Sequence, residues 1–217
     1  MDKPIDNFWN LNLRELKPKL EKNGFDVYLA DSAAAAKDLV LNDILPAIKP
    51  RTLSWGGSTT LASTGLYEIL RDGDEYETLD TWDHSLSNED KYERRRQALL
   101  VDCFLTGTNA VTEEGHLVNL DMIGNRTGAI TFGPKNVIIL LSRNKLVPDL
   151  QRAMDRIKEY VAPVNTMRLD MKTPCVKTGY CMDCESPQRI CNVWCITEKS
   201  FPKGRIKVVL INEDMGF

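Results

Sequence analysis

The sequence predicts an α/β fold in which a mixed open sheet is flanked by helices. In the first part of the chain, segments with helical spacing of apolar residues alternate with short apolar strands. A denser series of strands follows, and the runs 129–132 and 136–141 are nearly all apolar, as is typical of strands buried on both faces. The apolar run 206–212 closes the chain as a final strand. This order favours a helix-covered sheet over a helix bundle or a β-sandwich.

Helices and strands alternate regularly up to residue 73. A first helix is predicted by apolar residues at helical spacing, namely Trp9, Leu13, Leu16 and Leu20. It ends at Asn23-Gly24, and a strand is expected over 25–30. The expected elements that follow are a helix capped by Asp31-Ser32, a strand over 52–55 and a third helix ending at Asp72-Gly73.

The rest of the chain is expected to contain most of the strands. The charged stretch 74–97 predicts a loop and then a solvated helix capped near Ser87 or Asn88. Further strands are expected at 99–105, 117–120, 129–132, 136–141 and 206–212, with a helix from Pro148. The single candidate boundary lies near Ala162-Pro163. Residues 1–165 are therefore expected to form the α/β domain, and residues 166–217 a cysteine-rich segment and final strand packed on the same domain.

Charge and hydropathy exclude several classes of protein. The 217 residues include 28 Lys and Arg against 31 Asp and Glu, a net charge of −3 that argues against a nucleic-acid partner. No apolar run approaches the roughly 20 residues needed to span a bilayer. The N-terminus lacks the apolar stretch of a signal peptide. We expect a cytoplasmic protein without a membrane span.

Three polar segments begin or end apolar strands. The first is the turn Gly56-Gly57-Ser58-Thr59-Thr60, where a strand passes into a helix and backbone N–H groups attract anions. Its alternative interpretation is a tight turn in which Ser58 caps the helix. Because one sheet would gather such segments at a single edge, we expect this turn to bind a small anion.

The other two segments are expected to face that turn. One contains Asn109, Glu113 and Glu114, and a carboxylate held there is a candidate base or nucleophile. If the segment has an enzymatic role, one of the two glutamates should be partly buried; the alternative, which the residues alone favour, is a solvated turn. The last segment contains further candidate ligand-binding residues, namely Asn119, Asp121 and Asn125. The alternative for Asp121 is a simple ion pair with Arg126.

Cysteine is the most unusual component of the sequence. Five of the six cysteines follow the spacing Cys175-x5-Cys181-x2-Cys184-x6-Cys191-x3-Cys195. A cytosolic chain keeps its thiols reduced, so this density indicates a metal site before disulfides. Zinc and iron–sulfur clusters both accept four thiolates. The spacing lacks the second Cys-x2-Cys pair of a zinc ribbon, which favours iron–sulfur. If residues 191–195 are helical, Cys191 and Cys195 both face the site.

Taken together, these motifs resemble the lactate-utilisation (LUD) domain family. The resemblance covers about residues 5–217 in consistent order. Its segments are Gly56-Gly57-Ser58-Thr59-Thr60-Leu61, Thr108-Asn109-Ala110-Val111-Thr112-Glu113-Glu114-Gly115, Leu117-Val118-Asn119-Leu120-Asp121-x2-Gly124-Asn125-Arg126, Phe132-Gly133-Pro134-Lys135-Asn136-Val137, Asn144-Lys145 and Ala162-Pro163-x-Asn165. The cysteine segment resembles a short-chain branch with its own C-terminal cysteine motif.

The resemblance implies both a fold and a site. The fold is expected to be like the ribose-phosphate isomerase and CoA-transferase superfamily, with its pocket at the strand ends. The cysteine motif leaves Cys195 outside. We therefore expect one [4Fe–4S] cluster, with zinc as the alternative, and Cys103 in the core; the expected ligands are Cys175, Cys181, Cys184 and Cys191.

Two functions from different classes follow. In the first, the chain is an iron–sulfur accessory component of a system that oxidises lactate to pyruvate, acting with iron–sulfur partner subunits. In the second, it is an enzyme that acts on a phosphorylated or CoA-linked small molecule at a carboxylate-lined pocket, with Glu113 and Glu114 as candidate catalytic residues. No flavin or nicotinamide motif is present, which argues against a self-contained dehydrogenase.

Overall fold

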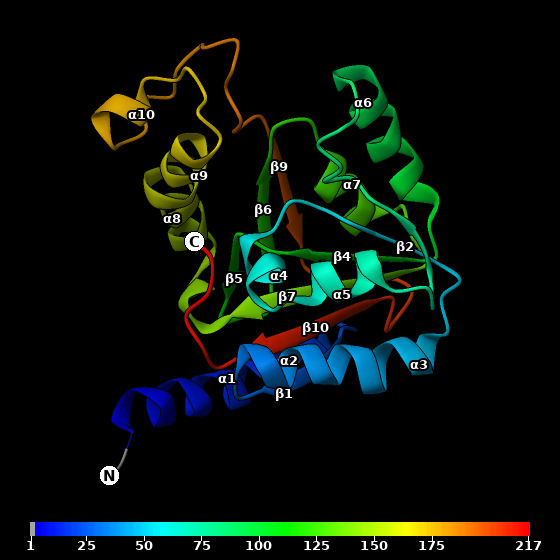
Figure 1. Cartoon of the computed structure of the whole chain (residues 1–217). Coiled ribbons are helices and arrows are strands. Elements are labelled where there is room, and N and C mark those ends of the chain that lie inside the picture. Colours follow the sequence, from blue (N-terminus) through cyan, green and yellow to red (C-terminus); the bar gives the residue numbers. More distant parts are fainter. Residues whose placement is uncertain (1–2) are drawn as a thin grey trace.

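Six parallel strands form the larger of two sheets in the computed structural model, which describes residues 3–217 (Figure 1). The strand order is β1-β10-β7-β4-β2-β3. The strands are β1 (Asp26–Ala30), β2 (Thr52–Trp55), β3 (Glu77–Leu79), β4 (Cys103–Gly107), β7 (Asn136–Ser142) and β10 (Ile206–Ile211). In register, Val208 of β10 lies between Val27 of β1 and Ile139 of β7, so the last strand of the chain is an interior strand of the sheet, next to the edge strand β1.

Helices cover one face of this sheet with an apolar layer. The helices are α2 (Ala33–Leu39), the π-helical turn η1 (Val40–Ile44), α3 (Leu45–Ile48), α4 (Thr59–Ser63) and α5 (Leu66–Asp72). Ser32 caps α2 as predicted, its hydroxyl accepting the Ala35 N–H at 3.2 Å. Alternate strand residues such as Leu53, Leu105 and Val209 pack against these helices in one buried cluster.

The opposite face packs against α1 (Pro4–Lys22), α7 (Asn125–Thr131) and the smaller sheet. Leu13, Leu16 and Leu20 of α1 are fully buried there, as their helical spacing predicts. Strands β7 and β10 contribute to both apolar layers, which explains why their sequences are apolar at nearly every position.

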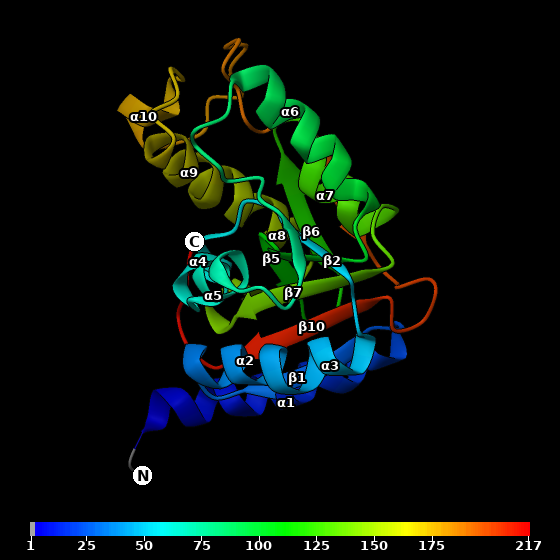
Figure 2. The same cartoon turned by 45° about the vertical axis from the view of Figure 1, so that its right-hand side comes forward.

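The smaller sheet carries the remaining strands and the cysteine segment. Its order is β8-β5-β6-β9, and its strands are β5 (Ala110–Thr112), β6 (Leu117–Asp121), β8 (Leu146–Val147) and β9 (Val193–Thr197). A helical run covers it, consisting of α8 (Leu150–Arg156), the π-helical turn η4 (Ile157–Val161) and α9 (Ala162–Arg168). Figure 2 shows α9 and α10 (Cys175–Thr178) at the end of the molecule opposite α1.

The structure confirms the predicted fold class and corrects several of its elements. Residues 129–132 are not a strand. Ala129 and Ile130 belong to helix α7, and their side chains are buried on its inner side. The expected third helix is two helices, α4 and α5, broken at Gly65 with a φ of 74°. In the charged stretch, α6 (Asn88–Gln97) is capped by Ser87 as expected, but β3 precedes it. Two short 3-10 turns complete the elements of the described chain, η2 (Ala98–Leu100) and η3 (Arg143–Lys145).

Within residues 3–217, no helix combines the length and the apolar character needed to cross a membrane.

Candidate functional site

The glycine turn after β2 lies against the end of β4. A Cβ atom on Gly107, the last residue of β4, would stand 2.5 Å from Ser58 Oγ. A Cβ on Gly56 would stand 2.7 Å from the Cγ of Arg126. Both glycines are therefore needed for the close approach of the turn, the strand end and α7. Ser58 also caps α4, accepting the Leu61 N–H at 3.1 Å, so the capping interpretation holds as well.

Arg126 is the centre of a buried polar network at this edge of the sheet. Its Nε and Nη2 donate to Asp121 Oδ1 at 2.9 and 2.6 Å, and its Nη1 donates to the Gly107 carbonyl at 3.2 Å. The other carboxylate oxygen of Asp121 accepts the Thr127 N–H at 2.9 Å. The expected Asp121–Arg126 pair therefore exists, but it is buried rather than a surface pair.

Two predicted asparagines complete this network. Asn109 Oδ1 accepts from Arg126 Nη2 and from the Leu120 N–H, both at 2.9 Å. Asn119 Oδ1 accepts from the Asn109 N–H at 3.3 Å and from Arg126 Nη1 at 3.4 Å. Two buried atoms here, Asn119 Nδ2 and Thr106 Oγ1, have no hydrogen-bond partner among the described residues. Buried polar atoms of this kind are rare and indicate a missing partner.

Two further cations, Lys145 and Arg156, lie beside the network, and neither was predicted from the sequence as a site residue. Lys145 is 3% exposed, and its Nζ donates to Thr60 Oγ1 at 2.7 Å. Burial, with smaller contributions from the charges of Arg156 and Arg126, lowers the pKa of the Lys145 amine from 10.5 to about 7. Arg156 donates to the carbonyls of Asn109 and Asn144 at 2.8 and 3.2 Å. In the sequence, Lys145 stands in the polar run 142–145 directly after an apolar strand, a position that does not by itself indicate burial.

The C-terminal tail covers the turn from outside. The Met215 carbonyl accepts from Ser142 Oγ at 2.6 Å and from Thr60 Oγ1 at 3.4 Å. Gly216 has a φ of 61°, and a Cβ there would stand 2.6 Å from Thr59 Oγ1 and 2.9 Å from Thr60 Oγ1. A side chain at this position would clash with the turn, so only glycine fits here. Phe217 packs on the apolar cluster between α8 and the smaller sheet.

Glu113 and Glu114 do not join this group. Both are exposed on the turn between β5 and β6, so the prediction that one of them is partly buried is wrong. Their turn packs on the end of α1, where Asn23 Nδ2 donates to the Glu114 carbonyl at 2.9 Å. The reason is that β5 leads away from the Arg126 network before the chain reverses. Asn125 is half-buried as the first residue of α7.

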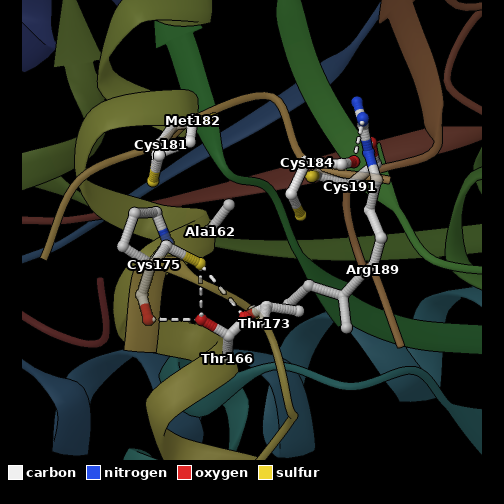
Figure 3. A pocket seen from close by; sticks show the side chains of 11 residues that line it. Ala162, Thr166, Thr173, Cys175, Cys181, Met182, Cys184, Arg189 and Cys191 are labelled. Atoms are coloured by element: carbon white, nitrogen blue, oxygen red, sulfur yellow. Dashed lines mark hydrogen bonds between the residues drawn. The ribbon is translucent and has the colours of Figure 1, made fainter. Parts of the chain in front are cut away.

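The four predicted cysteine ligands line one recess beside α9 (Figure 3). The recess is small and partly open to solvent. Its walls are largely apolar and include Ala162, Pro163, Met182 and Ile190. The thiols belong to three different parts of the fold: α10 carries Cys175, the following loop carries Cys181 and Cys184, and the chain entering β9 carries Cys191.

Hydrogen bonds hold the segments around the recess. Cys175 Sγ lies 3.3 Å from Thr166 Oγ1 and 3.2 Å from Thr173 Oγ1. Arg189 donates to the carbonyls of Cys184 and Cys191 at 2.8 and 3.1 Å. Arg189 also reaches Asp183 Oδ1 at 2.8 Å, and the hydrogen bond from Lys158 to the same oxygen lowers the pKa of Asp183. Within residues 3–217, no three His, Cys, Asp or Glu side chains are already arranged to hold a metal ion.

The other two cysteines lie outside the recess. Cys103 is fully buried in the core as expected, and burial raises the pKa of its thiol to about 12. Cys195 is in strand β9, so residues 191–195 are not the helix that would bring Cys191 and Cys195 to one side. Its sulfur instead lies 3.5 Å from Thr131 Oγ1 of α7.

These features define an α/β protein with an open parallel sheet, a buried cation cluster at its carboxyl edge and a thiol-lined recess nearby. The family model described as the LUD domain matches residues 13–211, so the chain belongs to the LUD domain family. This membership confirms the resemblance drawn from the sequence motifs and supports a function related to lactate utilisation.

Two solved structures are similar to the chain. One is a DUF162 family protein from Deinococcus radiodurans, with 15% identity and a TM-score of 0.49, covering 94% of this chain and 98% of its own. The other is a ribose-5-phosphate isomerase in complex with phospho-erythronic acid, with 19% identity and a TM-score of 0.33, covering 60% of this chain and 66% of its own. No curated protein matches the chain.

Proposed function

We propose that the protein is an iron–sulfur accessory component of a lactate-oxidising electron-transfer system. The observation that carries the proposal is the gathering of four thiols around one recess. Membership of the LUD domain family supplies the link to lactate utilisation. When bound, a [4Fe–4S] cluster supplies one-electron transfer. The residues proposed to hold it are Cys175, Cys181, Cys184 and Cys191.

The donor set and the recess fit a cluster better than a single zinc ion. Four tetrahedral Zn–S bonds of about 2.3 Å would hold the sulfurs roughly 3.8 Å from one another. Figure 3 instead shows the four thiols spread around the recess and not converging on one point, an arrangement that suits a group larger than a single ion. The apolar walls also suit a cluster, because they limit the access of water to it.

The surroundings of the recess favour electron exchange with a partner. Cys175, Cys181, Cys184 and Cys191 are all half-buried, so a group bound between them would lie near the surface. Large apolar side chains are exposed close by in the same segment, with Tyr180 59% and Met182 56% exposed. We propose that iron–sulfur partner subunits dock at this end of the molecule and exchange electrons with the cluster.

The structure favours the enzyme alternative less. An enzyme of this kind requires free carboxylates beside the glycine turn and the Arg126 network, whereas Glu113 and Glu114 are exposed on the turn between β5 and β6. Asp121 is already bound by Arg126 and the Thr127 N–H. These hydrogen bonds occupy both of its carboxylate oxygens, so Asp121 is not free to contact a substrate.

The test is metal and sulfide analysis of anaerobically prepared protein. We expect about four iron and four sulfide per chain, with the electron paramagnetic resonance signal of a reduced [4Fe–4S] cluster. Cys184→Ser should lose most of the iron, whereas the matched control Cys195→Ser should retain it. One zinc per chain, with no iron after anaerobic reconstitution, would overturn the proposal in favour of a structural zinc site.

A further inference from the structure

The buried charges at the carboxyl edge of the larger sheet do not balance. Three cations gather there, Arg126, Lys145 and Arg156, and Asp121 neutralises only the first. Lys145 donates to a hydroxyl and Arg156 to two backbone carbonyls, so neither forms an ion pair within the described chain. Buried cations without a counter-charge are costly. The cluster therefore lacks an anion.

Unused hydrogen-bonding capacity indicates the same missing group. An ammonium has three donors, and Lys145 uses one of them, toward Thr60. The fully buried Asn119 leaves both N–H donors of its amide unpaired. These donors and the cations lie around the same strand ends, because Asn109 bonds Arg126 through its side chain and Arg156 through its carbonyl.

We propose that a small oxyanion, a carboxylate or a phosphate, binds at Lys145, Arg156 and the Thr60 hydroxyl, and that the C-terminal tail competes with it. The Met215 carbonyl accepts the hydrogen bonds of Ser142 and Thr60 in this structure, as an oxygen of the ligand would. The tail closes the site from outside, because Gly216 packs directly against Thr59 and Thr60. The inference is independent of the cysteine recess and requires no metal.

Lys145 gives the site a measurable signature. Its pKa near 7 leaves most of the amine neutral at pH 8, and an adjacent anion favours the protonated form. The charged groups that surround it are Arg126 on α7 and Arg156 on α8, with Asp121 of β6 paired to Arg126, and Tyr160 lies against the Arg156 guanidinium. Binding should therefore take up close to one proton at pH 8 and much less at pH 6.

Calorimetric titration of the full chain tests the proposal. The probes are lactate, pyruvate and inorganic phosphate, with uncharged lactamide as the control ligand. Lactate or pyruvate binding alone identifies a carboxylate site, and phosphate binding alone identifies a phosphate site. Repeating the titration in buffers of different ionisation enthalpy gives the proton uptake. Gly216→Val should unseat the tail and tighten binding at least threefold.

Matched variants separate the site from adventitious binding. Lys145→Met and Arg156→Met should each weaken binding at least tenfold, whereas Arg152→Met, on an exposed position of the same helix, should leave it unchanged. Far-ultraviolet circular dichroism shows whether each variant is folded. The proposal is overturned if neither the native chain nor Gly216→Val binds any of the three anions. It is also overturned if binding persists in both Lys145→Met and Arg156→Met, or if lactamide binds as tightly as lactate.

Discussion

Asp121 joins the two sites of the molecule at the scale of a single residue. Its carboxylate holds Arg126 and the Thr127 N–H. Its carbonyl accepts the N–H of Asn192 at 2.9 Å, directly after Cys191. One residue thus fixes the polar network at the sheet edge and the end of the cysteine segment. A substitution of Asp121 should therefore disturb the hydrogen bonds of both sites.

Breaking the buried Asp121–Arg126 pair should be costly. Arg126→Met leaves the Asp121 carboxylate buried without its partner, and we expect a loss of about 3–5 kcal/mol in the free energy of unfolding. The exposed control Arg152→Met should change it by less than about 0.5 kcal/mol. Urea unfolding measures both values. A loss below about 1 kcal/mol for Arg126→Met would contradict the burial of this pair.

Replacing Lys145 should have the opposite effect on stability, with a defined pH dependence. The Lys145 pKa is about 7 in the folded chain and near 10.5 when unfolded, so between these values the unfolded state binds more protons and native stability rises with pH. Lys145→Met lacks this dependence. We expect the variant to be more stable by a few kcal/mol at pH 7, with a gap that narrows toward pH 10.

The comparison of stabilities at several pH values by urea unfolding tests this expectation. Lys19→Met, on the exposed side of α1, is the control and should show no pH-dependent gap. A gap between the native chain and Lys145→Met that stays constant from pH 7 to pH 10 would show that Lys145 does not titrate in this range.

Sequence patterns located most polar residues of the sheet edge, Arg126 included, but not the cations Lys145 and Arg156. The glycine turn, Asn109, Asn119 and Asp121 are polar interruptions between apolar strands, which makes them visible in the sequence. Lys145 is buried only because α8 and the C-terminal tail, both distant in sequence from Thr60, close over it. A lysine just after a strand is usually solvated, so no local pattern predicts this burial.

At the scale of the element, local chemistry decided which predictions held. Ser32, Ser58, Ser87 and Asp149 all cap helices, because a hydroxyl or carboxylate satisfies a free N–H within three residues. The run 129–132 was misassigned because four apolar residues fit a buried strand and a buried helix turn equally well. The π-helical turn η1 shifts the buried face by one residue, so that Leu45 is buried and Ala47 is exposed.

The loop after α10 depends on one side chain. Arg189 bonds the carbonyls of Cys184 and Cys191 and the carboxylate of Asp183. In Arg189→Ala we expect faster amide hydrogen exchange over residues 181–191 and at least a twofold lower iron content after reconstitution, with little change in the melting temperature. Arg168→Ala, whose hydrogen bonds stay within α9, is the control. Unchanged exchange in this loop would contradict the role assigned to Arg189.

At the scale of the whole molecule, the fold class followed from the alternation of elements, but the strand order did not. Ile206–Ile211 was expected as a strand, yet its place between β1 and β7 depends on pairing with segments about 180 and 70 residues earlier. Such pairing is set by the packing of both sheet faces, which local periodicity does not contain. The second sheet was missed because β5 and β8 are only three and two residues long.

The interior position of β10, paired on both sides, predicts the result of a truncation. Ending the chain at residue 200 removes the strand between β1 and β7 and exposes their apolar edges. We expect this fragment to be insoluble or to lack a cooperative thermal transition, whereas a chain ending at residue 214 should keep one. Differential scanning calorimetry distinguishes the two. A cooperative transition in the shorter fragment would contradict the role of β10 in the core.

The cysteine segment begins after α9, which continues the helical run α8–η4 that covers the smaller sheet, and it ends at β9, a strand of that sheet. The two ends of the segment are thus fixed by the folded core and not by anything bound between the thiols. For the proposed cluster, this means that insertion can follow folding as a separate event at an accessible end of the molecule. A proposed cluster lost to oxygen could then be replaced without unfolding the chain.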